Sequence, residues 1–93
     1  MEWLASGLRR DVCILLYPEE NRVQQIKSKL EDRYDRRISP EQYYGAISAL
    51  DDAGMLEIRV EGLNDVARLT DRGEKGVEAQ FAWMKTLIDD LES

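Results

Sequence analysis

The sequence predicts a mainly α-helical fold with a small β-hairpin (α+β), and three observations support it. Apolar residues recur at helical spacing through most of residues 7–53. Gly54 then separates these helices from residues 55–69, where alternating apolar and polar side chains flank a turn-forming segment. Residues 70–91 return to helical spacing. A helix, then a two-stranded wing, then a further helix is the element order of a winged helix-turn-helix.

Two helices are expected before the central one. The first begins after the N-cap residue Ser6 and ends near Tyr17, because Pro18 cannot continue it. Asn21 is expected to cap a second helix, which spans residues 22–34. The expected buried residues are Leu8, Val12, Leu15 and Leu16 in the first helix and Val23, Ile26, Leu30 and Tyr34 in the second.

The third helix has the clearest local signals. Ser39 is its N-cap, and Pro40 takes the first helical position, where a missing N–H costs nothing. Gln42 completes a capping box, and Gly54 is the expected left-handed stop. Ile38, just before the cap, forms either a brief strand or a plug in the core. The expected buried stripe is Tyr43, Ala46, Ile47, Leu50 and Ala53, and the outward face carries Glu41, Tyr44, Gly45, Ser48, Asp51 and Asp52.

The wing is expected to be a hairpin of two short strands. Residues 55–60 alternate, with Leu56, Ile58 and Val60 on one face. Residues 66–69 form the return strand, and Thr70 caps the last helix. The expected turn residues are Gly62, Asn64 and Asp65.

The last helix carries an apolar stripe that a domain of this size cannot cover by itself. We interpret this stripe as a dimer seam. The chain thus divides into a winged helix-turn-helix domain, residues 1–70, and a C-terminal dimerisation helix, residues 71–93, within one structural unit. The candidate dimer-interface residues are Trp3, Val77, Phe81, Trp83, Met84, Leu87, Ile88 and Leu91.

Charge is distributed unevenly along the 93 residues, whose net charge is −6. Residues 22–37 carry six Lys or Arg against three Asp or Glu, whereas residues 61–93 carry four against eight. Nine of the 13 cations are Arg, which suits bidentate phosphate contacts. An acidic surface is unfavourable for phosphate contact but typical of proteins that work in concentrated salt. The composition therefore favours a halophilic protein.

Several classes of function are excluded or disfavoured. The chain has no histidine and only one cysteine, which rules out His-dependent catalysis and the usual zinc sites. Adjacent acids such as Asp51 and Asp52 diverge by about 100° on a helix and form no catalytic pair. No glycine-rich phosphate loop is present. We expect no enzyme, metal or cofactor, and we interpret Cys13 as a buried structural residue rather than a redox sensor.

No apolar run is long enough to span a membrane, and no secretory signal precedes the first helix. A cytoplasmic location is therefore expected.

Five short segments, taken in order, resemble the PadR-like winged-helix transcriptional regulators, especially their short haloarchaeal forms. Residues 6–12, Ser-Gly-Leu-Arg-Arg-Asp-Val, resemble the opening helix of that family. Residues 43–47 resemble its recognition helix, with Tyr44 at the family tyrosine, and residues 53–56 resemble its step into the wing. Leu-Thr-Asp-Arg-Gly at 69–73 and the later Glu78, Ala79 and Trp83 resemble its last helix.

The resemblance implies a homodimer that binds double-stranded DNA and regulates promoters, with the helix at about Ser39–Ala53 in the major groove. Phosphate contacts are expected from the preceding basic segment. Nothing in the residues identifies a small-molecule effector. The candidate DNA-binding residues are Arg22, Arg36, Arg37, Ser39, Gln42, Tyr44, Gly45, Ser48, Arg59 and Arg68.

Each candidate also has an ordinary structural explanation. Arg36 and Arg37 could pair with Asp32 or Asp35 on the surface, where charges are usually solvated. Gln42 could serve only its capping box, and Tyr44 could simply pack on the helix surface. The two wing arginines could pair across the strands with Glu57 or Glu61. The alternative function is therefore a winged-helix protein–protein interaction module that does not bind DNA.

Overall fold

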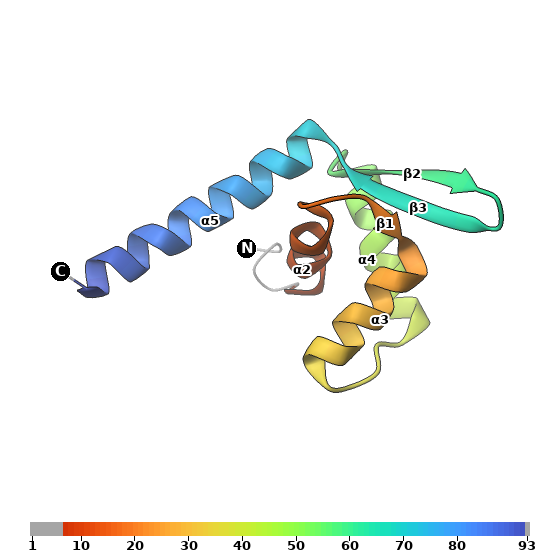
Figure 1. Cartoon of the computed structure of the whole chain (residues 1–93), viewed down its shortest axis with the longest axis horizontal. Coiled ribbons are helices and arrows are strands. Elements are labelled where there is room, and N and C mark those ends of the chain that lie inside the picture. The colour runs from red at the N-terminus through yellow and green to blue at the C-terminus, as the bar shows by residue number, and fades with distance from the viewer. Residues whose placement is uncertain (1–6, 93) are drawn as a thin grey trace.

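The computed structural model describes residues 7–92, in which four helices and a three-stranded antiparallel sheet follow one another (Figure 1). The elements are α2 (Gly7–Leu16), β1 (Asn21–Arg22), α3 (Val23–Tyr34), α4 (Pro40–Asp52), β2 (Leu56–Glu61), β3 (Asn64–Leu69) and α5 (Asp71–Glu92). This is the winged helix-turn-helix order that the sequence predicts. None of the described helices is both long and apolar enough to cross a membrane.

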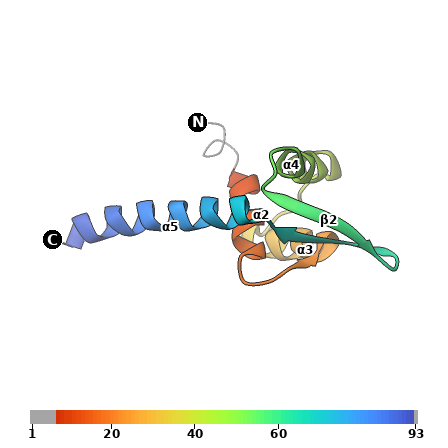
Figure 2. The same ribbon diagram turned by 90° about the horizontal axis from the view of Figure 1, so that it is seen from above.

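The molecule has a small helical body with two projections. The hairpin of β2 and β3 leaves the body on one side, and α5 leaves it on the other (Figures 1 and 2). The overall extents are 51 × 30 × 23 Å. A helix of 22 residues is about 33 Å long, so α5 accounts for much of the longest dimension.

The start of α3 differs from the prediction. Asn21 does not cap the helix, because Asn21 and Arg22 form the short strand β1, which pairs with Ala67 and Val66 of β3. The Oδ1 atom of Asn21 accepts a hydrogen bond from the backbone N–H of Arg22 at 2.8 Å instead. Arg22 occupies the cap position without a side-chain bond to the helix. The free edge of β3 offers backbone partners that the local sequence does not reveal.

The start and the end of α4 follow the prediction closely. The Oγ atom of Ser39 accepts a hydrogen bond from the backbone N–H of Gln42 at 3.2 Å, and Pro40 lies in the first turn. The reciprocal side-chain bond of a full capping box does not form among the described residues, so Gln42 keeps its amide free. Gly54 has a φ of 73°, the left-handed conformation expected after a helix end.

The sheet has the strand order β1-β3-β2. Glu61 pairs with Asn64, so Gly62 and Leu63 alone form the turn of the hairpin. Gly62 has a φ of 65°, as the first central position of a type II′ turn requires. Asn64 and Asp65 therefore belong to β3 and not to the turn, and the return strand begins two residues earlier than predicted.

The core lies between α2, α3, α4 and the base of the sheet. Ile38 is buried in it as a plug, whereas Ala53 is exposed at the end of α4, contrary to prediction. Cys13 is fully buried, and burial raises the pKa of its thiol to about 12, as expected of a structural cysteine. The buried core residues are Val12, Cys13, Leu16, Val23, Ile26, Leu30, Ile38, Tyr43, Ile47, Leu50, Leu56, Ala67 and Leu69.

The beginning of α5 is locked to the base of the wing. The Oγ1 atom of Thr70 accepts a hydrogen bond from the N–H of Gly73 at 3.1 Å and donates to the carbonyl of Gly54 at 2.5 Å. The backbone of Met55 passes so close to Gly73 that a Cβ there would lie 2.1 Å from the Met55 carbonyl oxygen. The predicted N-cap Ser6 and the predicted interface residue Trp3 lie outside the described residues.

Two glycine substitutions test this packing. Gly73→Ala should lower the free energy of unfolding by about 2 kcal/mol or more, because backbone must move to admit the methyl group. Gly45→Ala should raise it by about 0.5–1 kcal/mol, since Gly45 lies on an exposed helix face with nothing within 4 Å. Urea denaturation of both variants measures these changes. A Gly73→Ala protein as stable as the wild type would contradict the described contact with Met55.

Candidate nucleic-acid interface

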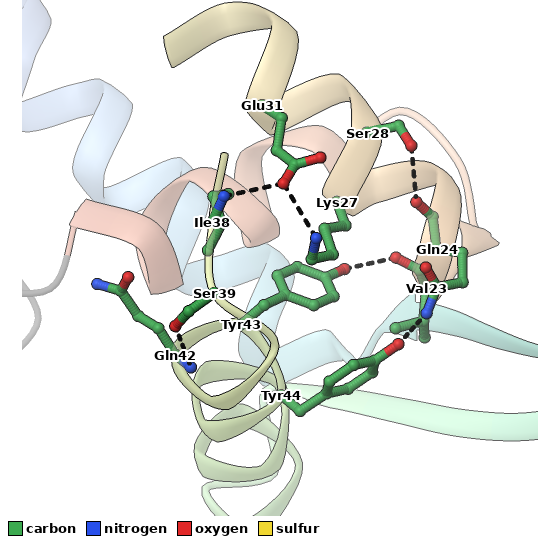
Figure 3. A network of polar contacts seen from close by, with 10 residues as sticks. All are labelled: Val23, Gln24, Lys27, Ser28, Glu31, Ile38, Ser39, Gln42, Tyr43 and Tyr44. Carbon is green, nitrogen blue, oxygen red and sulfur yellow. Dashed lines mark hydrogen bonds and ion pairs between the residues drawn. The ribbon is translucent and has the colours of Figure 1, made fainter. Parts of the chain in front are cut away.

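The two adjacent tyrosines of α4 both reach toward the start of α3, but Tyr43 is buried and Tyr44 is exposed (Figure 3). Tyr43 points into the core, where its hydroxyl donates to the backbone carbonyl of Val23 at 2.6 Å (Figure 3). Burial raises the pKa of this hydroxyl above its ordinary value. Tyr44 is about 41% exposed, and its ring meets that of Tyr43 edge to face, with centroids 5.3 Å apart. The buried tyrosine thereby fixes which face of α4 remains open.

Tyr44 also reaches across to the start of α3. Its hydroxyl is the hydrogen-bond partner of the Nε2 atom of Gln24 (Figure 3). The two side chains form the wall of a depression between α3, α4 and the tip of the wing. This depression is lined by Arg22, Val23, Gln24, Tyr44, Leu63, Asn64 and Asp65. Gln24 was not predicted to take part, because an exposed glutamine on a helix carries no local signal.

A single carboxylate holds the loop before α4. The Oε2 atom of Glu31 accepts from the backbone N–H of Ile38 at 2.8 Å and from the Nζ atom of Lys27 at 3.0 Å (Figure 3). These two bonds, the first above all, lower the pKa of Glu31. At the beginning of the loop, Asp35 adopts a left-handed φ of 54° and closes α3. The loop geometry is therefore fixed from both sides.

The loop presents Arg36 and Arg37 to solvent. Neither guanidinium lies within 4.0 Å of a carboxylate of the described residues, so the predicted alternative of pairing with Asp32 or Asp35 does not occur. Both arginines border an open hollow that they share with Glu31, Asp32 and Asp35. They remain available for an external anion.

The two arginines of the wing are in a different situation. Arg68 donates to Glu57 on the neighbouring strand at 2.7 Å, which is the cross-strand pairing that the sequence leaves open. Arg59 pairs with Glu61 at 2.7 Å and also with Glu20, which precedes β1. Arg59 and Arg68 share one face of the hairpin, because Arg68 lies opposite Glu57, two residues from Arg59, whereas the buried Leu56 and Leu69 lie on the other face.

Helix α4 itself carries only negative charge. Residues 40–52 contain no Lys or Arg but three exposed acids, Glu41, Asp51 and Asp52. Positive charge comes only from flanking segments: the loop arginines at one end and Arg22 beside Tyr44. The face is thus acidic along the helix and basic at its borders.

The structure brings some of the predicted site residues together and separates others. Arg22 and Tyr44 share one depression. Ser39 and Gln42 begin α4 directly after the loop arginines, and Gly45 and Ser48 are exposed further along the helix. Arg59 and Arg68 do not line this depression. Among residues 7–92, no three His, Cys, Asp or Glu side chains are grouped so that they could hold a metal ion.

The second predicted surface lies on α5. Val77 is partly buried against the core, but the stripe beyond it is uncovered. At the base of this stripe the hydroxyl of Tyr17 donates to Glu78 at 2.6 Å, and this bond, first among the causes, raises the pKa of Tyr17. The exposed residues are Phe81, Trp83, Met84, Leu87, Ile88 and Leu91.

This architecture defines a winged-helix protein with an extended C-terminal helix. Its fold is that of PadR-like proteins, which confirms the resemblance at the level of the fold. The PadR-like transcription factor of Bacteroides fragilis superposes with a TM-score of 0.81 at 20% identity, over 98% of this chain and 93% of that one. RosR of H. salinarum gives a TM-score of 0.80 at 20% identity, over 85% of this chain and 73% of that one.

A transcriptional regulator of Clostridium thermocellum gives a TM-score of 0.73 at 16% identity, covering 96% and 93% of the two chains. No family model and no curated protein sequence matches the chain.

The loop that carries the two arginines should respond to acid through Glu31. Because its folded pKa lies below its ordinary value of 4.5, Glu31 stabilises the folded state at neutral pH. That stability is lost as pH falls through the folded pKa. Glu31→Gln should therefore be less stable than wild type at neutral pH, and the difference should shrink below pH 4.5.

Urea denaturation at several pH values measures this difference. Glu41→Gln removes one exposed carboxylate nearby without touching the loop and serves as the control for net charge. A difference between Glu31→Gln and wild type that stays constant from neutral pH to strongly acidic pH would contradict the role of Glu31.

Proposed function

We propose that this protein is a homodimeric, DNA-binding transcription regulator of the PadR-like type. Helix α4 enters the major groove, and the segment before it holds the phosphates. The observation that carries the proposal is the open face of α4, with Tyr44 exposed and Arg36 and Arg37 unpaired beside the helix start. Two proteins of the same fold are named transcription regulators, which also supports a role outside catalysis.

The proposed contacts are of two kinds: contacts to phosphates, which position the helix, and contacts to bases, which recognise the sequence. Arg36 and Arg37 lie at the N-terminal end of α4, where unpaired backbone N–H groups add positive potential, and they fix the helix on the phosphate backbone. Gln42 lies in the first turn with its amide free, and a glutamine amide can bind adenine through two hydrogen bonds. Gly45 and Ser48 continue the same face and allow close approach to the bases.

The other proposed contacts come from outside α4 and its preceding loop. Arg22, beside Tyr44, reaches a phosphate on the wing side of the helix. Arg59 and Arg68 on the wing can reach a backbone only if they leave their carboxylate partners. They are therefore weaker candidates than the loop arginines.

The dimer is proposed from α5. Its stripe of large apolar side chains is solvent-exposed in one chain, with Phe81 at 66% and Ile88 at 52%. Within one chain, no other described helix or strand covers this stripe. The α5 helix of a second copy would cover it. Two α4 helices related by a two-fold axis would then read half-sites about 34–36 Å apart, or a multiple of that distance.

One observation favours a second function, a protein–protein interaction module. Helix α4 itself carries three acids and no cation, and the net charge of the chain is −6. Phosphate contact by such a surface depends on a few flanking arginines, and it is opposed by general repulsion. A regulator that works in concentrated salt, where this repulsion is screened, reconciles the acidic surface with DNA binding.

Charge-matched variants test the DNA proposal. Arg36→Ala with Arg37→Ala should weaken binding to duplex DNA from beside the protein's own gene by on the order of tenfold, and should reduce the salt slope by about 2. Fluorescence anisotropy across a KCl series into the molar range, with random duplex as competitor, measures both. Arg72→Ala with Lys75→Ala, which removes two exposed cations on α5, is the control.

Equal losses in the two double variants would show that only net charge matters. No binding of the wild type at any salt concentration, with the protein folded, would favour the interaction module instead.

The dimer has its own test. Ile88→Asp places a charge in the apolar stripe and should shift the protein from dimer to monomer in sedimentation velocity. Thr86→Asp, about half a turn away, adds the same charge on the opposite side of the helix and should leave the dimer intact. A monomeric wild type, or equal behaviour of the two variants, would exclude the proposed seam.

A further inference from the structure

Arg59 is the most fully occupied cation among the described residues. Its NH1 atom donates to one oxygen of Glu20 at 2.9 Å, and its NH2 atom donates to the other. Its Nε and NH2 atoms donate to Glu61 at 3.1 and 2.7 Å. Four of the five guanidinium N–H groups are thereby used.

This geometry leaves no edge of the guanidinium free. An arginine binds a phosphate bidentately through one of two edges, NH1 with NH2 or Nε with NH2. Glu20 occupies the first edge and Glu61 the second. Arg36, Arg37 and Arg22, in contrast, have no carboxylate within 4.0 Å among the described residues.

The two carboxylates differ in origin. Glu61 lies on the same strand as Arg59, two residues away, and so moves with the wing. Glu20 comes from the segment between α2 and β1, and β3 separates β1 from β2 in the sheet. Glu20 therefore ties the projecting hairpin to the helical body from across the sheet. Hydrogen bonds from Arg59 lower the pKa of Glu20, so the pair stays ionised at neutral pH.

We infer that Glu20 is an autoinhibitory residue: its carboxylate occupies the phosphate-binding edge of Arg59 and must be displaced before the wing contacts a nucleic-acid backbone. This inference rests on the proposed DNA-binding function and deepens it. Both partners are about 45% exposed, so the pair can exchange with an external anion. A phosphate offers the same two-oxygen geometry as the carboxylate that it replaces.

An adjacent pair of acids provides the test. Glu20→Gln weakens the pair with Arg59, and Glu19→Gln removes the same charge one residue away, from an exposed side chain with no ion-pair partner within 4.0 Å among the described residues. Binding of both full-length variants to the duplex DNA described above is measured by anisotropy at several KCl concentrations. Glu20→Gln should bind about two- to five-fold more tightly than Glu19→Gln.

A second pair of variants isolates Arg59. In an Arg59→Gln background, Glu20→Gln should bind no more tightly than Glu19→Gln, because the group that it releases is absent. Thermal unfolding shows that each variant is folded. A gain from Glu20→Gln that survives in this background would overturn the inference.

The remaining outcomes separate the inference from the proposed function. If all variants bind DNA equally, Glu20 contributes only net charge and the inference fails while the function stands. If Glu20→Gln binds more weakly than Glu19→Gln, the pair instead holds the wing in its binding position, and the inference also fails. If no variant binds at any salt concentration, the DNA-binding function and the inference fall together.

Discussion

The buried hydroxyl of Tyr43 is the interaction on which the rest of the candidate site depends. It donates to the carbonyl of Val23, at the start of α3, and so joins the two helices at a fixed rotation. Because Tyr43 is completely buried, α4 cannot turn about its axis without exposing a large aromatic ring and leaving a polar atom unpaired. The rotation of α4 in turn decides that Tyr44, Gly45 and Ser48 face outward.

The surface around α4 combines few cations with many acids. The ion pairs are distributed unevenly over this surface. Cations beside α4 are free, whereas the wing cations are held by carboxylates. Glu31 is used to shape the loop and forms no ion pair within 4.0 Å with the arginines next to it. The acidic composition therefore does not cancel the positive charge uniformly. It leaves a short basic segment beside the N-terminus of α4, whose unpaired backbone N–H groups add to the positive potential.

Much of the fold could be predicted because local chemistry determines it. Ser39, Pro40 and Gly54 specify where α4 begins and ends, and the alternation of residues 55–60 specifies a strand. Strand β1 could not be predicted, since two residues become a strand only when the edge of β3 is present. For the same reason Asn21 was wrongly expected to cap α3.

The candidate site divides in a similar way. The exposed face of α4 follows from helical periodicity, and so it could be predicted. Contacts between distant segments, such as Gln24 with Tyr44 and Glu20 with Arg59, carry no periodic signal and emerge only in the folded chain. Lys27 and Glu31 have the i,i+4 spacing of a helical ion pair, which is visible in the sequence. The hydrogen bond from the backbone N–H of Ile38 to Glu31 has no such sequence signal.

The crowded contact between Gly73 and Met55 has a mechanical consequence. The first turn of α5 packs directly against the backbone at the base of the wing, so the direction of α5 is set at its first turn by the winged domain. Over the helix length of about 33 Å, a tilt of about 5° at the first turn moves the far end by about 3 Å. A small change in the tilt of α5 at residue 73 therefore gives a larger displacement at residue 91.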